Sequence, residues 1–116
     1  MLKSLKWLGR SREIVQGFVK TVRAEIGYQL YRVQQGLMPT DYKSMASVGK
    51  GVFEIRLHRP HEHRVLYVAK LKDKVYVLHA FEKKTQKTSQ RDMETAKKCY
   101  QELMGRMNYL KIKESL

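Results

Sequence analysis

The chain has 116 residues, enough for one domain (1–116) with a hydrophobic core but not for two. It carries 24 Lys and Arg against 11 Asp and Glu, a formal net charge of +13 at pH 7. Because this excess repels itself in a compact chain, we expect a polyanionic partner such as RNA, or an acidic protein that masks the charge. A single cysteine excludes an intrachain disulfide. The sequence shows neither an apolar run of about 18 residues nor a leader, so we expect a cytoplasmic protein without a membrane partner.

The amino-terminal part predicts one strand and a divided helix. Its short apolar opening suggests an edge strand over Lys3–Leu8 that joins the later sheet. Ser11 is a candidate N-cap, and apolar residues over Ile14–Val33 recur at spacings of three and four, which indicates an amphipathic helix. Gly17 divides it into a short turn and a long helix. The polar stretch Thr40–Lys50 is expected to be a loop.

Three apolar-rich runs predict consecutive strands, and they occupy Val52–Leu57, Arg64–Leu71 and Val75–Phe81. The first run alternates apolar and polar residues, the pattern of a strand that buries one face and offers the other. Lys72-Asp73-Lys74 suits a tight hairpin between the second and third runs. Short connections make these strands an antiparallel meander.

A helix is predicted to close the chain. Ser89 and Asp92 resemble a capping box, and apolar residues follow at three-four spacing to Met107. This pattern predicts a helix of about 17 residues packed on the sheet. The polar tail Asn108–Leu116 is expected to fray. The order of elements predicts an α+β fold, a small antiparallel sheet with N-terminal helices and a C-terminal helix that cover one face.

Cationic side chains gather along the polar side of the predicted sheet. Arg56 and Arg64 lie on facing strands and are expected to project to solvent, where they could clamp a phosphoryl group. Lys83 and Lys84 follow the third strand and add positive charge. The further candidates for RNA contact are Lys43, Lys50, His58 and Lys87.

Metal-independent RNA cleavage is the enzyme hypothesis that these residues allow, because RNA supplies its own nucleophile, the 2′-hydroxyl. The protein then has to align the groups, move one proton and stabilise charge on the phosphoryl oxygens. His79, His58 or Glu54 are candidates for the proton transfer. The histidines around Pro60 lack a neighbouring Cys or Asp, so no metal site is expected. Composition alone does not separate cleavage from passive RNA binding.

Several stretches resemble the phage-derived, HigB-like branch of the RelE/ParE toxin superfamily, from about Leu5 to Leu103. They are GYQLYRVQQGLMP, GVFEIRL and HRVLYVAKLKDKVYVLHAFEKKTQKT. The resemblance implies a fold similar to microbial ribonucleases and a type II toxin, usually a ribosome-dependent endoribonuclease that cuts mRNA without a cofactor. It also implies a helix-turn-helix antitoxin as partner, with operator DNA contacted only through that antitoxin.

The resemblance also suggests roles for single residues. Arg64 matches the family arginine that contacts the scissile phosphate, and Arg56 matches the arginine that ends the preceding strand. Lys83 and Lys84 match a basic pair where relatives carry a leaving-group arginine. The RelE-type tyrosine that follows this pair has no counterpart in TQKTSQRD. Two alternatives stay open, a ParE-like poison of DNA gyrase and a non-catalytic, basic RNA-binding module.

Overall fold

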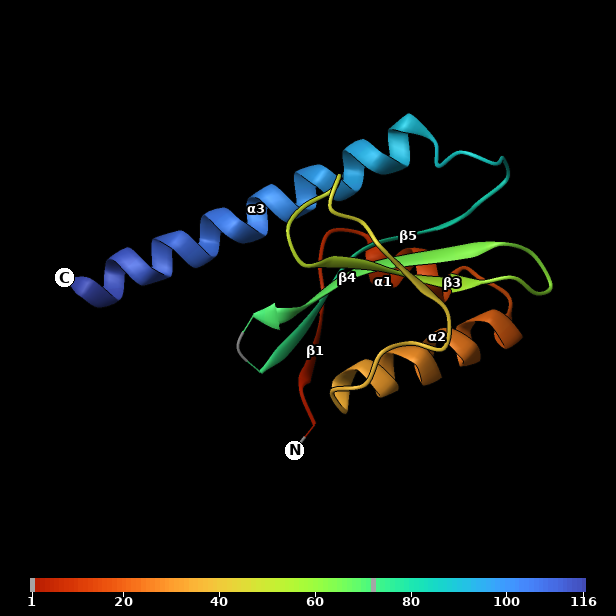
Figure 1. Ribbon diagram of the computed structural model, residues 1–116, viewed down its shortest axis with the longest axis horizontal. Helices are drawn as coiled ribbons and strands as arrows, with labels where there is room; N and C mark the ends of the chain where they lie inside the picture. The colour runs from red at the N-terminus through yellow and green to blue at the C-terminus, as the bar shows by residue number, and fades with distance from the viewer. Residues whose placement is uncertain (1, 72) are drawn as a thin grey trace.

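The sheet is the centre of the fold, and the computed structural model describes it within residues 2–71 and 73–116 (Figure 1). The elements in chain order are β1 (Ser4–Trp7), α1 (Ser11–Gln16), α2 (Lys20–Gln34), β2 (Tyr42–Ser44), β3 (Val52–Leu57), β4 (His63–Leu71), β5 (Lys74–Glu82) and α3 (Gln90–Ser115). The strand order is β1-β5-β4-β3-β2. All neighbours are antiparallel except β1, which pairs with β5 in parallel.

This arrangement confirms the α+β fold, the three-strand meander and the division of the first helix at Gly17. The edge strand expected at Lys3–Leu8 is β1, which occupies Ser4–Trp7. The hairpin expected at Lys72-Asp73-Lys74 includes position 72, which lies outside the described residues.

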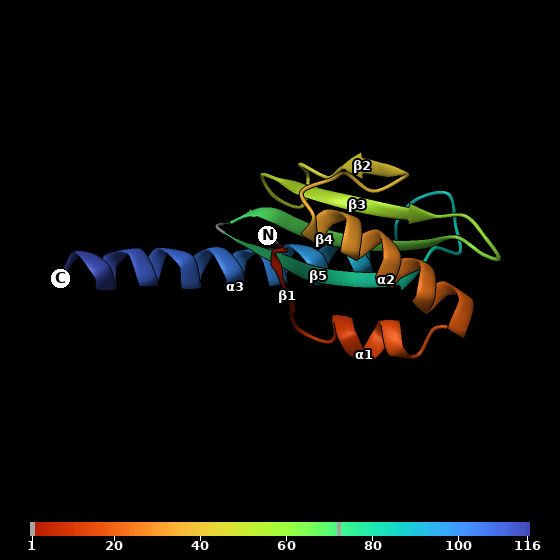
Figure 2. The same cartoon turned by 90° about the horizontal axis from the view of Figure 1, so that it is seen from below.

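Both faces of the sheet are covered, so the prediction that the helices cover one face is wrong. Figure 1 shows α3 above the sheet and α2 below it, and Figure 2 shows the same layers from another side. Ile55 and Val65 belong to the cluster of buried residues between the sheet and helices α1 and α2. Val52 and Leu66 belong to the cluster between the sheet and α3. The central strands are apolar on both sides, and each apolar side needs a cover.

The expected loop Thr40–Lys50 contains strand β2, which the sequence pattern did not indicate. Lys43 of β2 lies opposite Glu54 of β3. All three residues of β2 are exposed, so the strand lacks the alternating apolar residues that predict a half-buried strand. Backbone pairing with β3 at the edge of the sheet is what makes it a strand.

Helix α3 has 26 residues, and the prediction of about 17 with a frayed tail is wrong. Beyond the sheet, residues 108–115 contain good helix formers and neither Gly nor Pro, so nothing ends the helix there. Figure 1 shows this end projecting beyond the sheet. The N-cap prediction is confirmed, because the Ser89 hydroxyl accepts a hydrogen bond from the Asp92 amide at 3.1 Å.

None of the helices within residues 2–71 and 73–116 combines the length and hydropathy that a membrane span requires.

Candidate active site

Two arginines face each other at the end of the central strands. Arg56 of β3 and Arg64 of β4 are direct partners in the antiparallel register. Strand alternation puts both on the same face of the sheet as Glu54, the face that α3 covers further along. Like charges directly opposite each other destabilise a sheet, so this pair needs a compensating carboxylate. Glu54 provides it, with Oε1 at 3.6 Å from Arg64 Nε.

The guanidinium of Arg64 is buried, with 2% of the residue exposed. Its Nη1 donates to the carbonyl oxygens of His63 at 3.0 Å and Leu57 at 3.3 Å. Its Nη2 donates to Oε1 of Glu62 at 2.7 Å. The prediction that Arg64 projects to solvent is therefore wrong, because the strand end and its turn close over the side chain. Arg56 is half-buried.

Glu54 is a buried carboxylate, with 3% of the residue exposed. Its Oε2, together with Nε of Arg56 and Nε of Arg64, has no hydrogen-bond partner within the described residues. Burial raises the pKa of the Glu54 carboxyl, against the opposing effect of Arg64 and the other nearby cations. Buried polar atoms without a hydrogen-bond partner are uncommon in proteins, and buried carboxylates with a perturbed pKa are enriched at functional sites.

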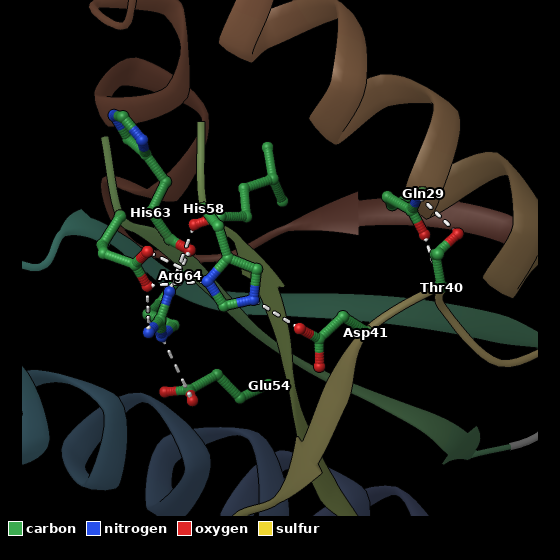
Figure 3. Close-up of polar contacts among 9 residues, drawn as sticks. Gln29, Thr40, Asp41, Glu54, His58, His63 and Arg64 are labelled. Atoms are coloured by element: carbon green, nitrogen blue, oxygen red, sulfur yellow. Dashed lines mark hydrogen bonds and ion pairs between the residues drawn. The ribbon is translucent and has the colours of Figure 1, made fainter. Parts of the chain in front are cut away.

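A chain of ionic contacts leads from Arg64 to the surface, and Figure 3 shows His58 between Arg64 and Asp41. His58 Nδ1 lies 2.9 Å from both carboxylate oxygens of Glu62. The other ring nitrogen, Nε2, contacts the Asp41 carboxylate. An ionised carboxylate only accepts, so both ring nitrogens must carry a proton. These hydrogen bonds, first to Asp41 and then to Glu62, raise the pKa of His58.

The outer end of this chain is attached to α2. Buried Gln29 accepts from the Thr40 amide at 2.8 Å and donates to the Thr40 hydroxyl at 2.9 Å. The next residue, Asp41, accepts from the Arg56 amide through its carbonyl at 3.0 Å. Gln29 and Glu62 are therefore part of the site's support. Neither residue is indicated by the sequence, because neither lies in a motif.

The basic pair after β5 lines an open hollow beside Arg64. This hollow, of about 440 Å³, is lined by Glu62, Arg64, Lys83, Lys84, Thr85 and Gln86. The Lys83 amide donates to the Glu62 carbonyl at 2.8 Å and holds the two loops together. Arg56 lines a separate hollow of about 480 Å³, together with Asp41 and His58. The structure thus places Arg64, Lys83 and Lys84 around one hollow and Arg56 at the other hollow.

His79 lies away from this hollow. A register shift between β4 and β5 pairs Leu66 with His79 but the next residue, Tyr67, with Val77. The side chain turns toward α3, where Nε2 lies 2.8 Å from Asp92 Oδ1. With 6% exposure, His79 lines a space of about 520 Å³ next to α1 and α3. Its catalytic role stays a prediction.

The other predicted RNA-contact residues spread over the surface. Lys43, Lys50 and Lys87 are exposed. Lys50 lies in a turn, and its backbone carbonyl accepts a hydrogen bond from the Tyr100 hydroxyl at 3.0 Å. In the part of the chain that the structure describes, no group of three or more His, Cys, Asp or Glu side chains could hold a metal ion.

Comparisons with known proteins agree with the fold. A family model described as "Phage derived protein Gp49-like" matches residues 13–101. Among solved structures, the chain is similar to a double-arginine mutant of the Escherichia coli toxin RelE in the free state, with 18% identity and a TM-score of 0.60. That similarity covers 91% of this chain and 98% of the other and concerns the fold. No curated protein matches the chain.

Proposed function

The chain belongs to the Gp49-like family of phage-derived proteins, and on that premise we propose that it is the toxin of a type II toxin–antitoxin system. Gp49-like proteins are a family of RelE-like toxins. We further propose that it is a metal-independent, ribosome-dependent endoribonuclease that cleaves mRNA. The observation that carries the nuclease proposal is the open hollow in which buried Arg64 meets Lys83 and Lys84.

The proposed chemistry uses the RNA's own 2′-hydroxyl. Its oxygen attacks the adjacent phosphorus, the bond from phosphorus to the 5′-oxygen breaks, and a 2′,3′-cyclic phosphate forms. Arg64 is proposed to contact the phosphoryl oxygens, since a guanidinium fixed by backbone carbonyls needs no reorganisation as charge develops. Lys83 and Lys84 stabilise the phosphate and supply a proton to the leaving oxygen.

Glu54 is the proposed proton acceptor, through one water molecule because the buried carboxylate does not itself line the hollow. Both ring nitrogens of His58 are engaged by carboxylates, so neither is free to accept a proton from the substrate. His79 is engaged with Asp92 beside α3. Glu54 has an oxygen without a hydrogen-bond partner within the described residues and a pKa raised by burial, which brings a carboxylate closer to the working range of a base.

Mapping mRNA ends after induction in cells tests this proposal. The wild type should create new ends within translated messages, and Glu54→Gln should reduce them by about a hundredfold. Glu114→Gln, the same change at an exposed position near the end of α3, is the control for a lost carboxylate outside the site. Growth arrest without new RNA ends, but with gyrase-dependent DNA breaks, would instead support the ParE-like alternative. RNA binding without arrest would support a non-catalytic module.

The proposed partner is a helix-turn-helix antitoxin, through which alone the toxin would contact operator DNA. An acidic antitoxin that covers the cationic hollow should associate more slowly as salt rises. Salt screens the attraction between exposed charges that are more than about 8–10 Å apart near physiological ionic strength. An antitoxin that wraps α1 and α2 through apolar contacts should show a flat profile. Association rates between about 50 and 500 mM salt distinguish the two modes of inhibition.

A further inference from the structure

The contacts of Arg64 leave one side of its guanidinium for a ligand, and Glu62 already occupies it. Nη1 is used by the carbonyls of His63 and Leu57, and Nε faces Glu54. The remaining nitrogen, Nη2, donates to Glu62 Oε1 at 2.7 Å. The Arg64 side chain is 3% exposed, whereas that of Glu62 is 40% exposed. Of the side chains that engage Arg64, Glu62 is therefore the one that reaches the open hollow.

A carboxylate and a phosphodiester compete for the same donors. Both are anions that accept two hydrogen bonds from a guanidinium edge. Bonds from Arg64 and then from His58 lower the pKa of Glu62, which keeps this carboxylate ionised. A phosphate in the hollow beside Lys83 and Lys84 would therefore meet a negative charge at the nitrogen it needs.

Glu62 also has a second place to go. The doubly protonated ring of His58 contacts both of its oxygens at 2.9 Å, so a carboxylate that leaves Arg64 keeps a cationic partner. Its backbone is held by the Lys83 amide, so the side chain can swing without opening the turn. Asp41 holds the far side of the His58 ring, while Arg56 and Arg59 line the same hollow as His58.

We infer that Glu62 is a built-in competitor that occupies the phosphate-binding edge of Arg64 and must shift onto His58 before a phosphodiester can bind. This inference rests on the proposed function, in which Arg64 contacts the scissile phosphate. It deepens that function because it makes substrate binding depend on a carboxylate exchange. An RNA phosphate supported by Lys83 and Lys84 could displace Glu62, whereas a weakly held anion could not.

Sulfate binding to the purified full chain tests the exchange without relying on RNA cleavage. Sulfate is a tetrahedral oxyanion that does not change charge near neutral pH, and the guanidinium N–H signals of Arg64 in ¹⁵N NMR report its arrival. Glu62→Gln should bind sulfate about tenfold more tightly than wild type, because a charged hydrogen-bonding competitor is gone. His58→Gln should bind it about threefold more weakly, because Glu62 then has no cation to receive it.

Glu82→Gln is the matched control, since it removes one exposed carboxylate from the end of β5. The inference is overturned if Glu62→Gln binds sulfate no more tightly than Glu82→Gln, or if His58→Gln matches wild type. Cleavage of mRNA on translating ribosomes, measured with the same variants, separates the two ideas. Unchanged sulfate affinities with intact cleavage by the wild type would refute the exchange alone. Tighter sulfate binding by Glu62→Gln, with no cleavage by the wild type on ribosomes, would refute the nuclease proposal alone.

Discussion

Replacement of Arg64 by methionine should destabilise the fold strongly, although the change keeps most of the side-chain volume. The guanidinium is 2% exposed and faces the equally buried carboxylate of Glu54. Its loss leaves that charge without its nearest cation, and removal of one member of a buried pair typically costs about 3–5 kcal/mol. The carbonyls of Leu57 and His63 also lose a donor. For a domain of this length, the melting temperature should fall by roughly 10–25 °C.

A double-mutant cycle measured by urea unfolding at pH 7 tests this reasoning. In the Arg64→Met background, Glu54→Met should recover about 1–3 kcal/mol, because it removes the stranded carboxylate. Arg56→Met is the matched control on the facing strand. Arg56 is half-buried and its Nε makes no hydrogen bond within the described residues, so its loss should cost less than about 1 kcal/mol. Equal costs at the two arginines, or a double mutant whose costs add, would refute the role of Glu54 as the partner of Arg64.

Three further predictions concern the basic loop, a tight contact and pH. Alanine at both Lys83 and Lys84 should lower the salt slope of single-stranded RNA binding by about 0.7 per lost phosphate contact, and an unchanged slope would place them outside the interface. Gly49→Ala should lower the melting temperature, because its Cβ would lie within 2.5 Å of an aromatic ring of α3. Gly105→Ala should raise it, because that position is open and helical, so shifts of the same sign would contradict the packing argument. Since the pKa of His58 is raised by folding, the folded chain holds that proton more tightly. Its stabilising effect is then complete below the ordinary value of 6.5 and is lost as pH rises through the folded pKa. His58→Gln should flatten this part of the stability profile, and a wild-type profile that does not fall there would count against the doubly bonded imidazolium.

Local patterns in the chain are enough to predict most of the fold. The alternating run Val52–Leu57 and the two apolar runs after it become β3, β4 and β5. Ser89 caps α3 as its spacing from Asp92 predicts. These features depend on side-chain period and on caps, which act over a few residues and are therefore visible in the sequence. The resemblance to RelE-like toxins likewise depends on short stretches of residues and agrees with the Gp49-like family match.

The candidate site shows where local patterns stop being informative. Alternation along β3 indicates that Glu54 and Arg56 share a face, but it does not say that this face is covered. Only the packed structure buries Glu54 and Arg64 together. Glu62 carries no signal in the sequence, since its role depends on a turn that brings it to Arg64 and His58. The burial of a charge depends on what packs around it, and the strand end and turn that close over Arg64 do so only after β3 and β4 have paired.

The sequence by itself determined the class of fold, the basic character of the protein and the residue types at the site. The tertiary structure decided which of these residues meet. It placed Lys83 and Lys84 beside Arg64, turned His79 toward Asp92, and covered both faces of the sheet. The physical reason is range, because propensity and periodicity act between neighbours in the chain. Desolvation and ion pairing, in contrast, depend on distances in space that exist only after the sheet and its helices have packed.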